Sequence, residues 1–237
     1  MSVNRTAAPS GVERVRRSAH RACYDRTVIN RVIDSSHIAH VGFVDTAKPV
    51  VIPMAHWRQE NYLYLHSAAG GRLAQICSSA DICVSIAALH GFVLARSAFN
   101  HSMNYESVVI HGRAAIVQKV SEREAALKAF MDRLFPGRWE ELRPVKQSEL
   151  NGTAILQISL DVACAKVRLG PPGDEMDDPD WCVWTGTLPL TSQFGPPEAD
   201  PSMVGGLATP MYLSNLAFDT AVASQPQATT SAASSAG

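Results

Sequence analysis

The segment from Leu63 to Leu73 holds the residues of this chain with the clearest chemical potential. It reads as an apolar strand ending at His66, a small turn that contains Ser67 and two glycines, and a helix that begins with Arg72. A helix start leaves backbone N–H groups without partners and carries partial positive charge. The Ser67 hydroxyl can donate a hydrogen bond, and Arg72 can hold two oxygens of one anion. The segment therefore predicts a phosphate-binding turn with His66 beside the ligand; an ordinary strand–helix connection is the alternative.

A second polar segment, residues 96–107, separates two apolar stretches. Asn104, Tyr105 and Ser107 belong to it, together with several further donors and acceptors. An ordinary hairpin does not need so many polar side chains. We therefore expect a loop that faces a ligand, with a plain surface loop as the alternative.

Cations and large aromatic residues occur together further along the chain. Lys166 and Arg168 precede a proline-rich turn, and Trp184 follows an acidic stretch, residues 174–180. This pairing suits a planar, anionic ligand, although tryptophans near a chain end also commonly serve only in packing. The acidic stretch lacks the alternation and the glycine of a calcium loop, which favours a solvated loop over a cation site.

Composition and motifs exclude several classes of function. There is no GxSxG elbow, no HExxH, no P-loop and no GxGxxG after a strand. The formal net charge is -1, and neither a basic face nor a basic run stands out. Both observations argue against nucleic acid as a partner. No apolar run approaches the roughly 20 residues of a membrane helix. A small-molecule substrate is therefore expected, with neither nucleic acid nor membrane as a partner.

The cysteines and the N-terminal residues bear on the cellular compartment. The five cysteines are odd in number, scattered and without a CxxC pair, which favours free thiols in a reducing cytoplasm over a disulfide framework or a zinc site. Residues 1–22 hold five arginines and one acidic residue. We expect a flexible basic arm there, with an organellar transit peptide as the alternative.

The pattern of the first half of the folded part predicts a helix and an antiparallel meander. Asp25 can cap a helix whose Val28, Ile29, Val32 and Ile33 share one face. Strands are expected at 37–44, 49–56 and 62–66. Turns of about four residues join them, too short for the crossover that parallel strands require.

The second half predicts further strands around two helices. After a short helix at 72–78, strands are expected at 81–88, 91–96 and 107–117, with a bend at Gly112. Ser121 and Glu124 suggest a capping box for a helix that Pro136 stops, and a strand at 154–160 would continue to Val167. The chain reads as one mainly β domain with flanking helices, residues 23–190, built as a closed or nearly closed barrel. Residues 191–237 form a Pro-, Gly-, Ser- and Ala-rich extension, expected to be disordered from Gln225.

Taken in order, these motifs resemble those of the flavin-binding split-barrel proteins related to pyridoxamine 5'-phosphate oxidase, in the branch that contains the Nim-type nitroimidazole-resistance proteins. The resemblance runs from about Val15 to Leu190. It rests on the segments 51–54, 63–67 with Arg72, 94–98, 104–109, 112–114, 166–168 and 184–186.

The resemblance implies a split β-barrel of the FMN-binding type and a homodimer that holds FMN at the subunit interface. Ser67 and Arg72 would bind the FMN phosphate, while Pro53 and Met54 would run along the isoalloxazine ring. His66 matches a histidine near the flavin in the Nim-type proteins, which makes it a candidate catalytic residue for substrate contact or proton transfer.

The remaining cofactor-binding residues implied by the resemblance come from the second half of the chain. Ser107 would contact the ring system, with Asn104 and Tyr105 beside it. Lys166 and Trp184 would approach from the partner subunit.

Two departures from the family pattern bear on activity. Gly71 stands where the classical oxidases place a cation, and their vitamin-phosphate signature is not recognisable here. Oxidation of pyridoxamine phosphate is therefore not expected. The leading hypothesis is an FMN-dependent oxidoreductase with nitroreductase-like activity on a small aromatic or nitro-bearing substrate and NADH or NADPH as electron donor. The alternatives are a haem-binding or haem-degrading split barrel and a flavin-binding module without turnover.

Overall fold

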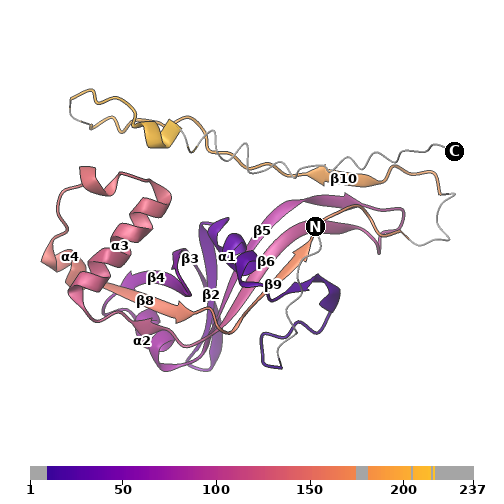
Figure 1. Cartoon of the computed structure of the whole chain (residues 1–237), viewed down its shortest axis with the longest axis horizontal. Coiled ribbons are helices and arrows are strands. Elements are labelled where there is room, and N and C mark those ends of the chain that lie inside the picture. Colours follow the sequence, from indigo (N-terminus) through magenta and orange to yellow (C-terminus); the bar gives the residue numbers. More distant parts are fainter. Residues whose placement is uncertain (1–9, 175–180, 204, 215, 217–237) are drawn as a thin grey trace, which may run out of the picture. The chain divides into compact units, whose positions relative to one another are not determined.

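The computed structural model describes residues 10–174, 181–203, 205–214 and 216 (Figure 1). The chain divides after Pro189 into two compact units. All the labelled helices and strands belong to the first unit; residues 211–214 of the second unit are helical. The predicted disorder from Gln225, most of the basic arm and most of the acidic stretch lie outside the described residues.

The first unit is built on one sheet of ten strands, and neighbouring strands in this sheet pair in the antiparallel direction. The strands are β1 (Ala22–Cys23), β2 (Ile38–Asp45), β3 (Lys48–Gln59), β4 (Tyr62–Ala68), β5 (Ile82–Leu94), β6 (Ser102–Gly112), β7 (Ala115–Ile116), β8 (Thr153–Ser159), β9 (Ala163–Arg168) and β10 (Gly186–Pro189). Their order is β1-β9-β6-β5-β2-β3-β4-β8-β7, with β10 added to β5. Over the described residues the two end strands, β1 and β7, do not pair with each other. Of the expected closed or nearly closed barrel, full closure is therefore wrong.

Four α-helices and two short 3-10 helices flank the sheet (Figure 1). They are α1 (Arg26–Asp34), α2 (Arg72–Ser79), α3 (Val120–Leu134) and α4 (Gln147–Gly152), with η1 (Ala19–Arg21) and η2 (Trp139–Glu141). The mainly β class with flanking helices is confirmed.

The predictions for the first half are confirmed in detail. The Asp25 carboxylate caps α1 by accepting a hydrogen bond from the N–H of Thr27 at 2.7 Å. The β2–β3 hairpin turns at Thr46 and Ala47, which have φ of 47° and 62°. Positive φ at both central residues matches the right-handed twist of the paired strands. Strands β2, β3 and β4 form the expected antiparallel meander.

The second half departs from prediction in how the strands are divided. The segments 81–88 and 91–96 are one strand, β5, interrupted by a bulge between Leu89 and Gly91. Strand β6 begins at Ser102, because its main chain pairs with β5 and β9 and thereby satisfies backbone groups that a loop would leave open. The strand expected from 154 to 167 is two strands, β8 and β9.

Helix α3 begins differently from the prediction. Its N-cap is Lys119, and no side chain caps it, so the capping box of Ser121 and Glu124 is wrong. The helix nevertheless ends at Leu134, just before Pro136, as expected.

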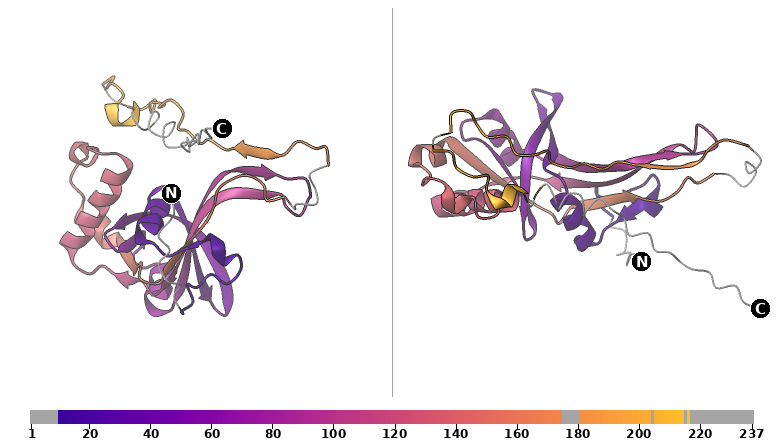
Figure 2. Two further views of the ribbon diagram at one scale, coloured as in Figure 1. Left: turned by 45° about the vertical axis from the view of Figure 1, so that its right-hand side comes forward. Right: turned by 90° about the horizontal axis from the view of Figure 1, so that it is seen from above.

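Two hydrophobic clusters lie on different faces of the sheet. The larger one joins α1 and α2 to the inward side chains of β2, β5 and β6, including Ile33, Val41, Val84 and Ile110. The smaller one lies under α3 and contains Trp57, Ile155 and the partly buried Phe130. Figure 2 shows β5 and β6 continuing beyond most of the sheet as an arm, and β10 pairs with this part of β5.

Candidate functional site

One face of the sheet carries several of the predicted cofactor residues. Lys166 lies opposite Ser107, and the next row of the register links Cys164, Val109, Ser85, His40 and Pro53. Since strand side chains alternate, Tyr105, Ser107, Lys166 and Pro53 point away from the core residues Val41, Val84 and Val108. We call this the outer face.

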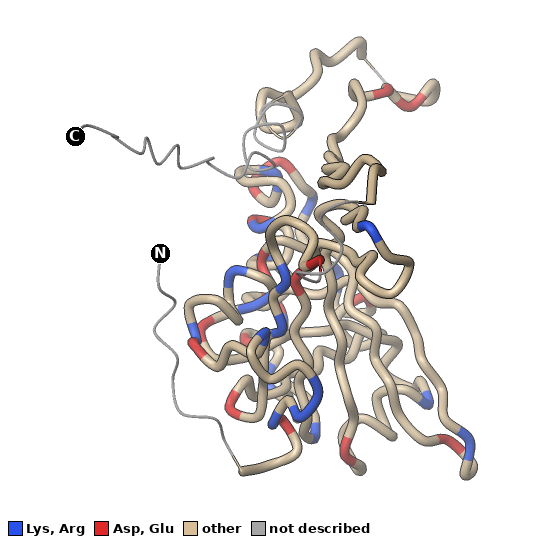
Figure 3. Tube along the Cα trace, turned by 90° about the vertical axis from the view of Figure 1, so that its right-hand side faces the viewer, with Lys and Arg blue, Asp and Glu red and all other residues tan. Residues whose placement is uncertain are grey.

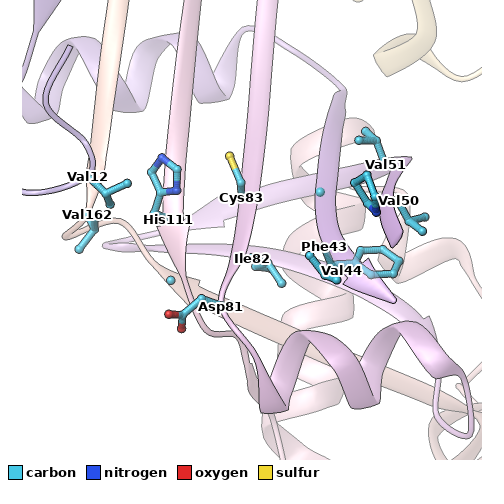
Figure 4. Close-up of a pocket in the computed structure, with 13 residues that line it drawn as sticks. Val12, Phe43, Val44, Val50, Val51, Asp81, Ile82, Cys83, His111 and Val162 are labelled. Atoms are coloured by element: carbon cyan, nitrogen blue, oxygen red, sulfur yellow. The ribbon is translucent and has the colours of Figure 1, made fainter. Parts of the chain in front are cut away.

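The outer face contains an open, apolar concavity of about 680 Å³ (Figure 4). Its lining includes Gly42, Val51, Cys83, His111 and Val162. Val44 and Val51 are each 64% exposed in the single chain. Large exposed apolar areas of this kind mark interaction surfaces.

The predicted phosphate-binding turn has the features of an anion site. Gly71 is the N-cap of α2, and no side chain caps that helix. A Cβ on Gly71 would lie 2.9 Å from the Ala68 carbonyl oxygen and 3.5 Å from Ser67 Oγ, so the backbone approach there requires glycine. The turn therefore leaves the first N–H groups of α2 open beside the Ser67 hydroxyl, which fits a phosphate.

Arg72 has a partner that the sequence did not reveal. Its Nη1 lies 2.7 Å from Asp45 Oδ2, at the end of β2. The Asp45 side chain is 13% exposed, whereas that of Arg72 is 69% exposed. One ion-pair contact from Nη1 leaves the other guanidinium N–H groups able to reach a phosphate. Figure 3 shows basic and acidic residues interspersed along the described chain, without a large area of positive charge. An anion would therefore be bound by individual side chains such as Arg72.

His66 and Ser67 are neighbours that face opposite sides of β4. The His66 ring lies 5.6 Å from Phe130 and 6.3 Å from Trp57, measured between ring centroids. Its Nδ1 is buried and has no hydrogen-bond partner among the described residues. Strand alternation therefore places His66 in the aromatic cluster under α3, and its role as a proton donor stays a prediction.

The other predicted residues are placed as follows. Met54 is partly buried against the larger cluster. Asn104 accepts a hydrogen bond from Arg168, and Ser107 Oγ lies 3.5 Å from the carbonyl oxygen of Lys166. Trp184 is 65% exposed and precedes β10.

Within one chain the predicted residues form two groups. Pro53, Met54 and the turn from Ser67 to Arg72 lie on β3, β4 and α2, whereas Tyr105, Ser107 and Lys166 lie on β6 and β9. Strands β5 and β2 separate the two groups in the sheet. The strand order alone therefore does not join them into a contiguous site.

Sequence reasoning missed a buried charged group at the bulge of β5. Glu106 is 2% exposed; its carboxylate accepts hydrogen bonds from both terminal nitrogens of Arg31 on α1 and lies 3.1 Å from His90 Nε2. Burial acts to raise the pKa of Glu106, but the hydrogen bonds and charge of Arg31, with His90, lower it overall. His90 is the extra residue of the bulge, because Leu89 pairs with Tyr105 and Gly91 with Asn104. Bulges commonly redirect one side chain in this way.

The described residues offer no metal-ion site. In the described part of the chain no cluster of three or more His, Cys, Asp or Glu side chains could hold a metal ion. Asp174, at the start of the acidic stretch, accepts hydrogen bonds from Arg96 instead. Cys23, Cys77, Cys83 and Cys164 are free thiols. None of the described helices combines the length and apolar character needed to span a membrane.

Comparison with known proteins identifies the family. The model of the pyridoxamine 5'-phosphate oxidase family matches residues 25–167. A search of curated proteins finds no significant match. Among solved structures, the flavocytochrome Anf3 from Azotobacter vinelandii is 36% identical with a TM-score of 0.86, and the match covers 89% of this chain and 99% of that one.

Two further structures extend the likeness. An FAD- and haem-binding protein from Mycobacterium smegmatis is 29% identical with a TM-score of 0.78, covering 83% of this chain and 97% of that one. A candidate 5-nitroimidazole antibiotic resistance protein from Bacteroides thetaiotaomicron shares the fold, at 21% identity and a TM-score of 0.52, covering 62% and 86%. The chain belongs to the pyridoxamine 5'-phosphate oxidase-like family and has its split-barrel fold.

Proposed function

We propose that this protein is a flavin-dependent oxidoreductase that binds the flavin phosphate at the turn between β4 and α2. The observation that carries the proposal is the uncapped start of α2, where Ser67, the close-packed Gly71 and Arg72 converge. The likeness to a flavocytochrome over 99% of its length supports the same conclusion.

The division of the predicted residues into two groups favours a site made by two copies of the chain. Pro53 and Met54 of one copy would line the flavin ring, and Ser107, Lys166 and Trp184 would reach it from the second copy. The exposed apolar outer face gives a homodimer a surface to bury. A dimer is therefore part of the proposal.

The bound flavin would supply the electron transfer, with NADH or NADPH as donor and a small aromatic or nitro-bearing compound as acceptor. The chain would hold the flavin by its phosphate and exclude water from the ring at the interface. His66 is the candidate proton donor.

The flavin held at this turn is either FMN or FAD. The sequence resemblance implies FMN, whereas the Mycobacterium smegmatis relative is described as an FAD-binding protein. Both flavins carry a phosphate at the end of the ribityl chain, so the same turn fits either. Mass spectrometry of the cofactor released from the purified protein decides between FMN and FAD.

The first test is the spectrum and size of the purified full chain. We expect a yellow protein with about one flavin per chain that sediments as a dimer. Stopped-flow mixing with NADH or NADPH should bleach the flavin bands. If neither donor reduces the flavin, the protein is a flavin carrier and not an oxidoreductase with these donors. A colourless monomer that takes up neither FMN nor FAD would contradict the proposal.

Replacing Arg72 with alanine should weaken flavin binding about ten- to a hundredfold, since a charge-assisted contact is worth roughly 1.5–3 kcal/mol. Fluorescence titration of the flavin-free protein measures this change. Arg113→Ala is the matched control, because that arginine is also exposed and ion-paired, 3.8 Å from Asp81. Equal affinities for both variants would remove Arg72 from the phosphate site.

A haem group in addition to the flavin is the second candidate function. Two structures that match more than four fifths of this chain are described as a flavocytochrome and as an FAD- and haem-binding protein. A Soret band in the purified protein, or after addition of hemin, tests this directly.

A further inference from the structure

The tip of the arm formed by β5 and β6 presents a histidine in a defined orientation. The Nδ1 of His101 lies 2.8 Å from the carbonyl oxygen of Ser97. Because a carbonyl only accepts, Nδ1 carries the proton and donates it, which leaves Nε2 of the neutral ring as a lone-pair donor. Nε2 has no partner among the described residues, and the side chain is exposed. A histidine that binds a metal usually donates a hydrogen bond from one ring nitrogen, for example to a backbone carbonyl, and binds the metal with the other nitrogen.

The loop that carries His101 is held in shape by further contacts. The Asn100 N–H donates to the Ser97 carbonyl at 3.2 Å and lies 3.2 Å from Ser97 Oγ. On the other side, Asp174 accepts from the backbone N–H and the guanidinium of Arg96, both at 2.8 Å. The ring orientation of His101 is thus set by a built turn.

Large exposed apolar side chains lie on this loop and on the neighbouring strands. Phe99, in the loop, is 93% exposed. On the strands, Leu188, Phe92 and Met103 lie in register across β10, β5 and β6, and are 60%, 49% and 49% exposed. Met103 is two residues from His101, about 7 Å along the strand. The arm therefore offers an apolar surface next to a nitrogen ligand, which suits a flat, apolar ring system with a metal at its centre.

In two other histidines the Nε2 atom, which usually binds haem iron, already has a partner. His56 Nε2 lies 3.1 Å from the Ile33 carbonyl in the core, and His90 Nε2 lies 3.1 Å from Glu106. The Nδ1 of His66 is buried. His101 differs from His56 and His90 because its Nε2 has no partner among the described residues.

We propose that His101 is an axial ligand of haem iron and that the porphyrin lies against Phe99, Phe92 and Met103. The inference rests on the haem function proposed above and adds the place of binding and the ligand. The coordinate bond uses the Nε2 lone pair, so its formation transfers neither a proton nor an electron. The partner chemistry is iron porphyrin, and the apolar residues of the arm provide its binding surface.

The test is hemin titration of the full-length wild type and of His101→Ala, followed by the Soret band and by electron paramagnetic resonance of the ferric form. We expect His101→Ala to weaken hemin binding by at least about tenfold and to change the ferric spectrum. His101→Cys should bind hemin with a thiolate-type spectrum. Phe99→Ala should weaken binding by about tenfold while keeping the wild-type ligand signature. His20→Ala, another exposed histidine, is the control.

The outcomes separate this inference from the proposed functions. A wild-type protein that binds no hemin would overturn the haem function and this inference with it, while flavin content would still test the flavin proposal. Hemin binding with an identical spectrum in His101→Ala would overturn the ligand assignment alone. Thermal unfolding of each variant shows that the fold is retained, which is expected because His101 and Phe99 are exposed.

Discussion

Replacing Arg31 with alanine is expected to lower the free energy of unfolding by about 3 kcal/mol, the low end of the range for breaking a buried ion pair. The cause is Glu106, whose carboxylate is 2% exposed and depends on the two terminal nitrogens of Arg31. Without Arg31 the carboxylate keeps only His90 as a partner. We place the effect at the low end because the Arg31 side chain is itself 54% exposed and water can partly replace it.

Urea unfolding at pH 7 measures this loss. Glu106→Gln in the Arg31→Ala background should recover part of it, since the amide carries no charge to desolvate. Lys119→Ala is the control, because it removes an exposed pair with Glu122 and should change stability little. A loss in Arg31→Ala no larger than in Lys119→Ala would show that the buried carboxylate does not depend on Arg31.

Acidification from pH 7 to pH 4.5 is expected to destabilise the protein through His56. This side chain is 1% exposed, and its pKa is lowered from 6.5 to about 4. Burial is the main cause; the charges of Arg133 and His37 act in the same direction, while the hydrogen bond to the Ile33 carbonyl and the charge of Asp34 oppose the shift. The unfolded chain therefore binds a proton between pH 6.5 and 4 that the folded chain excludes. Stability is complete above pH 6.5 and falls as the pH falls, by about 3 kcal/mol in all.

The measurement is urea unfolding of the wild type and His56→Gln at several pH values between 7 and 4.5. Glutamine can still donate to the Ile33 carbonyl but does not titrate in this range. Its stability should fall less steeply with acidification than that of the wild type. His37 also contributes in the same direction, because burial and then Arg133 lower its pKa, so a residual slope is expected in the variant. Parallel curves for the two proteins would exclude His56 as a source of the pH dependence.

Features that depend on local interactions could be predicted from the amino-acid sequence. The cap of α1 by Asp25, the tight β2–β3 turn and the strand–turn–helix from Leu63 to Arg72 each depend on residues within a few positions of one another. The glycine at position 71 and the missing cap of α2 follow from the same short segment. For this reason the strand, turn and helix could be predicted from this segment, whereas phosphate binding there stays a prediction.

Pairings between residues far apart in the chain became visible only in the three-dimensional structure. The polar residues 102–107 form a strand because β5 pairs with all of them and β9 pairs with those from Tyr105 onward. The bulge at His90 directs that side chain toward Glu106. Arg31 reaches the same carboxylate from 75 residues away, and Asp45 reaches Arg72 from another hairpin. Neither pairing leaves a periodic signal in the sequence. The face of each side chain was likewise set by strand register, which put Ser67 beside the turn and its neighbour His66 under α3.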